Sequence, residues 1–328
     1  MTKFKDSIAI IGGSGFIGKN LGNCFDEDNI NYKIYDIAEP ETAQHYEYLD
    51  VVSSKSLDII NGSRCIINLA AEHKDNILPV TRYDDVNVTG AKNVCNAARK
   101  YNIDTIIFTS SVAVYGFAKP NTDESGDINY FNDYGRTKFL AEEIYMKWFK
   151  EDSKNRRLII IRPTVVFGED NRGNVYNLLN QISSGKFLMI GNGENIKSMA
   201  YVKNVAAFIR FSLNLKKGLH LFNYVDKPDM DMKSLVLISR GMILKKKSIG
   251  MFLPGFVGLI VGRLFDFISF ISKKELSISS IRIKKFLSTT QFSSSVDTTG
   301  FVPPFSLEEG LIRTIKNEFL KSNESNSS

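Results

Sequence analysis

Short apolar runs and segments of helical periodicity alternate along the first half of the chain. Five runs rich in β-branched or aromatic residues predict strands: 7–12, 31–37, 64–70, 105–110 and 157–164. Runs 64–70 and 105–110 are nearly uniformly apolar, which is typical of a parallel sheet covered on both faces. Three intervening segments have helical spacing: 16–25, about 85–101 and about 132–151. This alternation predicts an α/β fold with a doubly wound parallel sheet.

The pattern loosens beyond about Arg172, where apolar runs are less regularly spaced. We therefore divide the chain into a first domain, 1–171, and a smaller C-terminal domain, mainly 172–320, interleaved with the first. Part of 197–225 is expected to return to the first domain. The polar tail 321–328 is expected to be disordered.

One stretch of the second domain is unusually apolar. Residues 249–262 contain no charge, and the stretch continues to Ile271 with lysines on both sides, at 245–247 and 273–274. Fourteen uncharged residues are too few to span a bilayer. Two interpretations stay open: a buried helix of the second domain, started by Pro254, or a helix lying at an anionic membrane surface.

Composition narrows the class of protein. The three cysteines of the 328-residue chain are far apart and have no metal-type spacing, which indicates reduced thiols in a cytoplasmic protein without a metal site. The first apolar run leads directly into a glycine-rich turn, so it is a strand and not a signal peptide. The net charge of +6 would favour anionic partners, but no interleaving of basic and aromatic residues suggests nucleic acid.

The glycine-rich turn has the pattern of a dinucleotide-binding loop between a strand and a helix. Gly12 permits the tight turn, Gly15 lets a pyrophosphate approach the backbone, and Gly18 allows close packing of the helix. Asp36 ends the second predicted strand, where a carboxylate suits the ribose diol of NAD and repels the extra phosphate of NADP. The sequence thus predicts a Rossmann-type NAD-binding domain whose loop also includes Ser14, Phe16 and Ile17.

A candidate catalytic set follows the fourth strand. Tyr134 and Lys138 stand at positions i and i+4 of a predicted helix and therefore share one face. An ammonium and the positive nicotinamide ring would favour the phenolate, which makes Tyr134 a candidate general base. Ser110 and Ser111 lie past the carboxyl end of the strand 105–110, the edge at which such sheets bind ligands, and Ser111 is placed to orient a substrate hydroxyl.

These motifs together resemble the extended short-chain dehydrogenase/reductase family of nucleotide-sugar epimerases and dehydratases, over nearly the whole chain. The resemblance is carried by the glycine loop, 68–71, 110–116, Tyr134-x-x-x-Lys138, 162–168 and 201–206. Ile11 stands where the family has threonine. The resemblance implies a homodimer built on helices near 86–101 and 132–151. It also implies further cofactor contacts, at Asp50 and Val51 near the adenine, at Leu69, Ala70, Ala71 and Asn87, and at Pro163 and Val165 beside the nicotinamide.

Family dehydratases have an Asp-Glu pair where this chain has Val112 and Ala113, which leaves epimerisation or reduction. The segments 70–75, 171–179, 197–201, 223–229 and 281–286 resemble a narrower group, 4-epimerases that act on N-acetylglucosamine carried by undecaprenyl diphosphate in O-antigen synthesis. By this resemblance Lys74, Asn174, Lys197 and Arg282 contact substrate, together with Ser111 and Tyr134. It also suggests a peripheral position at the inner face of the cytoplasmic membrane.

Three alternatives stay open: a 4-epimerase of UDP-linked N-acetylglucosamine, a 4-reductase of a related keto-sugar, and a catalytically silent NAD-binding regulator. Consumption of reduced cofactor would identify a reductase. The intact Ser–Tyr–Lys set argues against a regulator.

Overall fold

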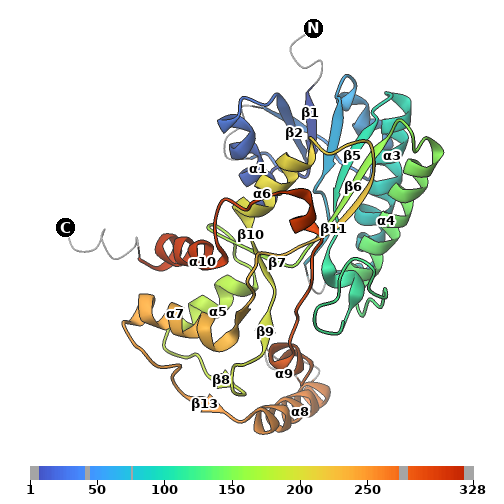
Figure 1. Ribbon diagram of the computed structural model, residues 1–328. Coiled ribbons are helices and arrows are strands. Elements are labelled where there is room, and N and C mark those ends of the chain that lie inside the picture. The colour runs from blue at the N-terminus through green and yellow to red at the C-terminus, as the bar shows by residue number, and fades with distance from the viewer. Residues whose placement is uncertain (1–6, 41–44, 75–76, 273–279, 321–328) are drawn as a thin grey trace.

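The computed structural model describes residues 7–40, 45–74, 77–272 and 280–320, in an upper lobe built on a large sheet and a lower lobe of helices and short strands (Figure 1). All seven strands of the large sheet are parallel. In spatial order they are β11 (Gly218–Tyr224), β6 (Arg157–Pro163), β5 (Thr105–Thr109), β4 (Cys65–Asn68), β1 (Ile8–Ile11), β2 (Tyr32–Asp36) and β3 (Tyr46–Tyr48). The predicted doubly wound parallel sheet is confirmed.

Two helical layers cover the sheet (Figure 1). One face packs against α3 (Gly90–Lys100) and α4 (Asp133–Glu151) through Ala9, Ile66, Val94 and Trp148. The other packs against α1 (Phe16–Glu27) and α6 (Val202–Ser212). Neighbouring strand residues point to opposite faces, so strands covered on both sides must be apolar at nearly every position.

The sequence prediction of single elements was incomplete in three places. The strands β3 and β11 were not assigned. The helix expected over 85–101 has a π-helical first part, Asp84–Thr89, before α3. The apolar stretch 249–271 is helical only from Gly255, because Phe252 and Leu253 form strand β13 beside β8.

The lower lobe contains α5 (Asn174–Ser183), α7 (Met232–Leu244), α8 (Gly255–Ser272) and α9 (Ser280–Leu287), and α10 (Leu307–Ile315) lies between the lobes (Figure 1). Its short strands form three pairs: β7 (Val165–Phe167) with β10 (Met199–Tyr201), β9 (Ile196–Lys197) with β12 (Met230–Asp231), and β8 (Met189–Ile190) with β13 (Phe252–Leu253). The remaining elements are short helical segments: Ser54–Ile60, Thr81–Tyr83, Val112–Tyr115, Val296–Thr299 and Lys316–Leu320.

The chain crosses between the lobes more than once. After β7 it enters the lower lobe at α5, and α6 and β11 then return it to the large sheet. The predicted tail 321–328 and Lys273–Lys274 lie outside the described residues. Among the described residues, no helix is long and apolar enough to cross a membrane.

Candidate active site

The glycine loop lies at the point where the strand order reverses, between β1 and β4. Gly12 has φ +78°, and a Cβ there would lie 2.4 Å from the Ala70 nitrogen. A Cβ on Gly18 would lie 2.3 Å from the Gly13 oxygen. A Cβ on Gly15 would meet only the Gly12 oxygen, at 3.3 Å. The fold itself therefore requires glycine at 12 and 18, whereas the outer side of Gly15 is open to a ligand.

Gly15 is also the N-cap of α1, and Phe16 and Ile17 form its first turn. The first N–H groups of a helix have no partner within the helix and, with the helix dipole, attract anions. The loop thus has the shape and polarity that a pyrophosphate requires.

Asp36 is held at the mouth of this loop. Its carboxylate accepts from the Ser14 nitrogen (3.0 Å) and from the Ala38 nitrogen (3.1 Å). The Ser14 hydroxyl donates to the Ala38 oxygen (2.6 Å). The bonds fix a negative charge beside the predicted pyrophosphate position, where it suits a ribose diol and repels a 2′-phosphate.

We expect Asp36→Asn to reduce the preference for NAD over NADP. The substitution removes the repelling charge and one acceptor for the loop, so the ratio of the two dissociation constants should change about tenfold, or about 1.4 kcal/mol. Titration calorimetry with NAD and with NADP measures the two dissociation constants. Glu39→Gln, which removes an exposed acid nearby, is the control. An unchanged ratio would show that Asp36 does not face the ribose.

The other predicted cofactor residues lie at strand ends of the same sheet edge. Asp50 caps a turn by accepting from the Val52 nitrogen (2.9 Å), and Asn93 donates to the Val51 oxygen (2.8 Å). Leu69, which precedes Ala70 and Ala71, donates its N–H to the Ile11 oxygen (2.8 Å). Pro163 ends β6, and Val165 begins β7 with its side chain exposed. The fold therefore brings segments from five strands to one edge.

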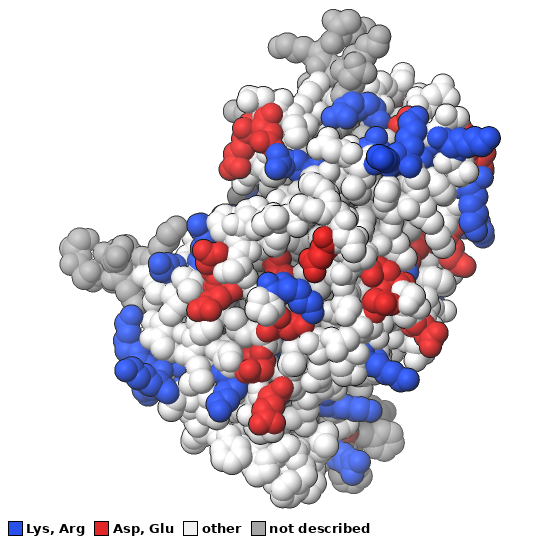
Figure 2. Space-filling view, viewed as in Figure 1, with Lys and Arg blue, Asp and Glu red and all other residues white. Residues whose placement is uncertain are grey.

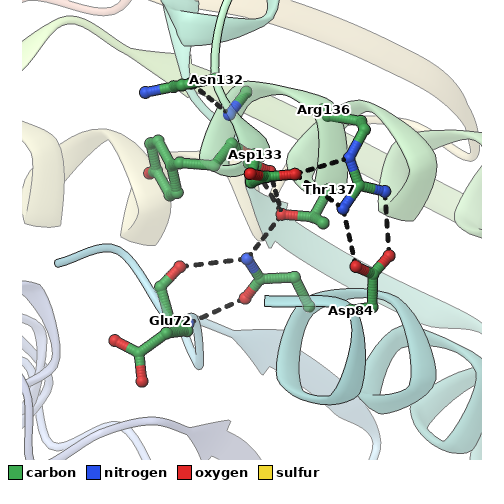
Figure 3. A network of polar contacts seen from close by, with 9 residues as sticks. Glu72, Asp84, Asn132, Asp133, Arg136 and Thr137 are labelled. Carbon is green, nitrogen blue, oxygen red and sulfur yellow. Dashed lines mark hydrogen bonds and ion pairs between the residues drawn. The ribbon is translucent and has the colours of Figure 1, made fainter. Parts of the chain in front are cut away.

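Asn87, a predicted cofactor residue, is held by hydrogen bonds within the protein. Its amide is buried, accepts from the Glu72 nitrogen (2.8 Å), and donates to the Glu72 oxygen (3.0 Å) and the Thr137 hydroxyl (2.9 Å). Figure 3 shows how this network joins the segment after β4 to α4, beside the ion pair of Arg136 with Asp84. Asn87 thus positions the segment after β4 and helix α4 relative to each other.

Helix α4 places Tyr134 beside Ser111. Asn132 caps the helix by accepting from the Gly135 nitrogen (2.9 Å). A Cβ on Gly135 would lie 2.5 Å from the Ala113 oxygen, so glycine lets the first turn of α4 approach the turn after Ser111. Ser111 lies close enough to Tyr134 for its hydroxyl to lower the pKa of the phenol. Lys138 lies one helical turn further and is buried, with its Nζ 4.4 Å from the centroid of the Phe108 ring.

Burial sets the proton affinities of this set. It raises the pKa of Tyr134, and the hydrogen bond with Ser111 opposes this. Burial lowers the pKa of Lys138 to about 7, opposed by the carboxylate of Glu142. In the protein alone Tyr134 is therefore a neutral phenol near pH 7, and it needs a positive charge close by to become a base.

The buried hydroxyl of Ser110 has no hydrogen-bond partner within the described part of the chain. Because buried polar groups are nearly always paired, it is available to a ligand at this edge. Together with the open side of Gly15 and the fixed carboxylate of Asp36, it shows that the edge fits a dinucleotide.

We expect Lys138→Met to abolish activity yet stabilise the ligand-free protein at low pH. The folded pKa of about 7 lies below the ordinary 10.5, so protonated Lys138 opposes folding below pH 7 and this cost falls as the pH rises toward 10.5. The gain in unfolding free energy should shrink by about 3 kcal/mol between pH 6 and 9. Urea unfolding of wild type and variant at pH 6 and pH 9 measures this difference in stability, and Lys147→Met, at an exposed lysine, is the control. An equal gain in stability at the two pH values would refute the prediction.

Beneath the catalytic helix is a buried ionic network that the sequence analysis missed. Arg162 donates to both Glu142 carboxylate oxygens (2.9 and 2.6 Å) and to the Tyr115 hydroxyl (2.5 Å), which donates to Asn223 (2.8 Å). All four side chains are buried. Two signals could have found the pair: an arginine that follows four apolar residues in strand β6, and a glutamate one turn after Lys138.

The predicted substrate residues are spread over both lobes. Lys74 and Asn174 are exposed, after β4 and at the start of α5. Lys197, on β9, is partly buried; its Nζ donates to the Ser288 oxygen (2.5 Å), and burial lowers its pKa to about 8. Arg282 lies on α9, whose last residue immediately precedes Ser288. The structure therefore brings Lys197 next to the end of the helix that carries Arg282.

Comparisons with known proteins agree with this geometry. Residues 8–223 match the model of the NAD dependent epimerase/dehydratase family. An N-acetyl-alpha-D-glucosaminyl-diphospho-ditrans,octacis-undecaprenol 4-epimerase of Escherichia coli O157:H7 is 46% identical over 96% of both chains.

Two solved structures share the fold. They are a UDP-N-acetylglucosamine 4-epimerase from Methanobrevibacter ruminantium (TM-score 0.71, 21% identity, 95% of this chain and 98% of that one) and a UDP-glucuronic acid 4-epimerase from Bacillus cereus (TM-score 0.73, 18% identity, 97% and 99%).

Proposed function

This chain belongs to the NAD dependent epimerase/dehydratase family, and on that premise we propose that it interconverts N-acetylglucosamine and N-acetylgalactosamine on undecaprenyl diphosphate. It is an NAD-dependent sugar 4-epimerase, an isomerase. The single observation that supports the lipid-linked substrate is the 46% identity to the Escherichia coli enzyme, which extends over 96% of both chains and so includes the lower lobe.

The chain's own residues supply the proton chemistry. Tyr134, as phenolate, takes the proton from the sugar 4-hydroxyl, and the hydroxyl of Ser111, which lies beside Tyr134, donates to that sugar oxygen. When bound at the glycine loop, NAD would supply the hydride acceptor and a positive charge that favours the phenolate. Lys138, buried one turn along α4, adds charge when protonated.

Epimerisation requires the 4-keto sugar to turn over before hydride returns to its opposite face. The diphosphate has to stay bound during this step, since release would leave an oxidised product. We propose that Lys197, Arg282 and Asn174 hold the diphosphate, and that Lys74 lies on the sugar side. Val112 and Ala113 begin the short turn Val112–Tyr115 and carry no acid that could eliminate water.

A substrate deuterated at C4 tests epimerisation against reduction. Because the same hydride leaves and returns, we expect the galacto product to keep its deuterium, with no reduced cofactor consumed. Loss of the label, or product formed only in step with oxidation of added NADH, would identify a reductase and refute the proposal.

Two further proposals concern the oligomeric state and the cellular location of the enzyme. We propose a homodimer built on α3 and α4, as the resemblance implies, and a cytoplasmic enzyme that works at the inner face of the cytoplasmic membrane in O-antigen synthesis. The identity of the lipid carrier in the Escherichia coli relative supports this location.

A further inference from the structure

Helix α8 packs on the protein through glycines. Gly258 and Gly262 are buried, and added Cβ atoms would lie 2.5 Å from the Ile190 Cγ2 and 2.8 Å from the Ser280 Cα. This pair, four residues apart, therefore lets α8 lie against β8 and the start of α9. The inward face of the helix is formed by its smallest residues.

The large apolar side chains of α8 point the other way. Phe256, Ile260 and Leu264 are 69%, 57% and 60% exposed. They repeat every four residues and are offset by two positions from the glycines, about 200° around the helix. Met251 and Phe252, just before the helix, are 72% and 61% exposed. We call these five residues the apolar face: Met251, Phe252, Phe256, Ile260 and Leu264.

A surface helix of a water-exposed protein normally has the reverse arrangement, with its large apolar residues inward. Figure 2 shows the end of the molecule formed by β13 and α8 as a largely white surface, with blue side chains to its sides and red ones above it. Clustered exposure of large apolar side chains marks an interaction site.

The segment that carries the apolar face is basic. Residues 245–265 contain Lys245, Lys246, Lys247 and Arg263 and no acid, and all four cations are exposed. The next acid, Asp266, is turned toward the protein, where it accepts from the Ser280 nitrogen (3.2 Å). The partner of this surface should therefore be apolar inside and negatively charged at its boundary.

We propose that the apolar face docks on an anionic lipid bilayer, with α8 lying in the interface. Insertion of the apolar stripe between headgroups, with basic residues beside the phosphates, is the binding mode of interfacial helices. The inference rests on the proposed function in one respect, since a polyprenyl tail stays in the bilayer and the enzyme has to come to it.

The chain links this surface to the predicted diphosphate site. Helix α8 packs against α9, and Lys197 donates to the Ser288 oxygen directly after α9. Docking through α8 therefore brings the lobe that carries Lys197 and Arg282 to the membrane surface, where the diphosphate of a lipid-linked sugar lies.

Co-sedimentation of the full chain with vesicles tests the docking. We expect binding to vesicles of phosphatidylethanolamine with phosphatidylglycerol, weaker binding to pure phosphatidylcholine, and at least about tenfold weaker partition for the triple variant F256S/I260S/L264S. The matched control, Y48S/L219S/V302S, changes three exposed apolar residues elsewhere and should bind like the wild type.

A second measurement reports the contact directly. Trp148 is fully buried, so in F256W the new tryptophan is the exposed one, and brominated lipids should quench it. The same tryptophan in Y48W should not be quenched. Because quenching is measured in F256W, this test stays valid even if the triple variant F256S/I260S/L264S does not fold.

Two results would overturn the docking. The first is absence of vesicle binding and of F256W quenching. The second is a dimer, seen by analytical ultracentrifugation, that the triple variant dissociates, because this would make the face a contact between two copies. Epimerase activity on detergent-solubilised substrate is measured separately, so a protein that epimerises but ignores vesicles refutes the docking alone, and one that binds vesicles but does not epimerise refutes the proposed function alone.

Discussion

Tyr134→Phe lowers kcat for epimerisation by about 10²–10⁴-fold, the range expected for loss of a general acid–base group. The proton of the sugar hydroxyl has no comparable acceptor, because Ser111 is a neutral hydroxyl beside this phenol and Lys138 is buried. Phenylalanine keeps the ring and its packing, so cofactor affinity and thermal stability should stay near the wild-type values. The rate at which the epimerised sugar forms at saturating substrate gives kcat, and the ratio of the wild-type to the variant value tests the prediction.

Tyr130→Phe is the matched control, because Tyr130 is an exposed tyrosine four residues earlier in the chain. It should turn over at the wild-type rate. A Tyr134→Phe enzyme within a few fold of the wild type would mean that another group takes the proton, and the mechanism above would be wrong.

Glu142→Gln destabilises the protein by about 3–5 kcal/mol, because it leaves the guanidinium of Arg162 buried without its counter-charge. The neutral amide cannot accept from both guanidinium nitrogens, so at least one charge-assisted bond is lost as well. Urea unfolding of the ligand-free protein measures the free energy of unfolding.

The same variant should also affect Lys138. The Glu142 carboxylate raises the pKa of Lys138 against burial, so its loss should move that pKa further below 7. Glu143→Gln, the neighbouring residue of α4, should change neither quantity. The double variant Glu142→Gln/Arg162→Met should recover part of the lost stability; if it is less stable than the single variant, the pair is not the source of the effect.

Local patterns explain what could be predicted of the fold. The strands β1, β4, β5 and β6 are buried on both faces, so their apolar runs are visible in any window of the sequence. Strand β3 has three residues and lies at the sheet edge, with Tyr48 exposed, and leaves no such run. Strand β11 mixes exposed and buried positions, and only its pairing with β6 identifies it.

The candidate site likewise has features that could be predicted from local sequence and features that could not. The glycine loop and the Tyr134–Lys138 pair are local in sequence, so their placement followed from one strand–helix turn and one helical period. The bonds of Asn87 to Glu72 and Thr137, which lie fifteen and fifty residues away, and the Arg162–Glu142 pair depend on how distant elements meet. The direction of the Tyr134 pKa shift depends on burial, which no local pattern contains.

The apolar stretch 249–271 shows the limit of periodicity most clearly. Its sequence allowed a buried helix or an interfacial one, because nearly all its positions are apolar. Two glycines decide which side faces the protein, and they do so through Ile190 and Ser280, which lie outside the stretch. The orientation of α8 could therefore come only from the structure.

The most direct test of the account compares two substrates without added cofactor. Purified protein is incubated with undecaprenyl-diphospho-N-acetylglucosamine and, separately, with UDP-N-acetylglucosamine, and the sugars are identified after hydrolysis. We predict N-acetylgalactosamine from the lipid-linked substrate. N-acetylgalactosamine from the UDP-sugar alone would contradict the lipid-linked assignment, and its absence from both would contradict epimerisation itself.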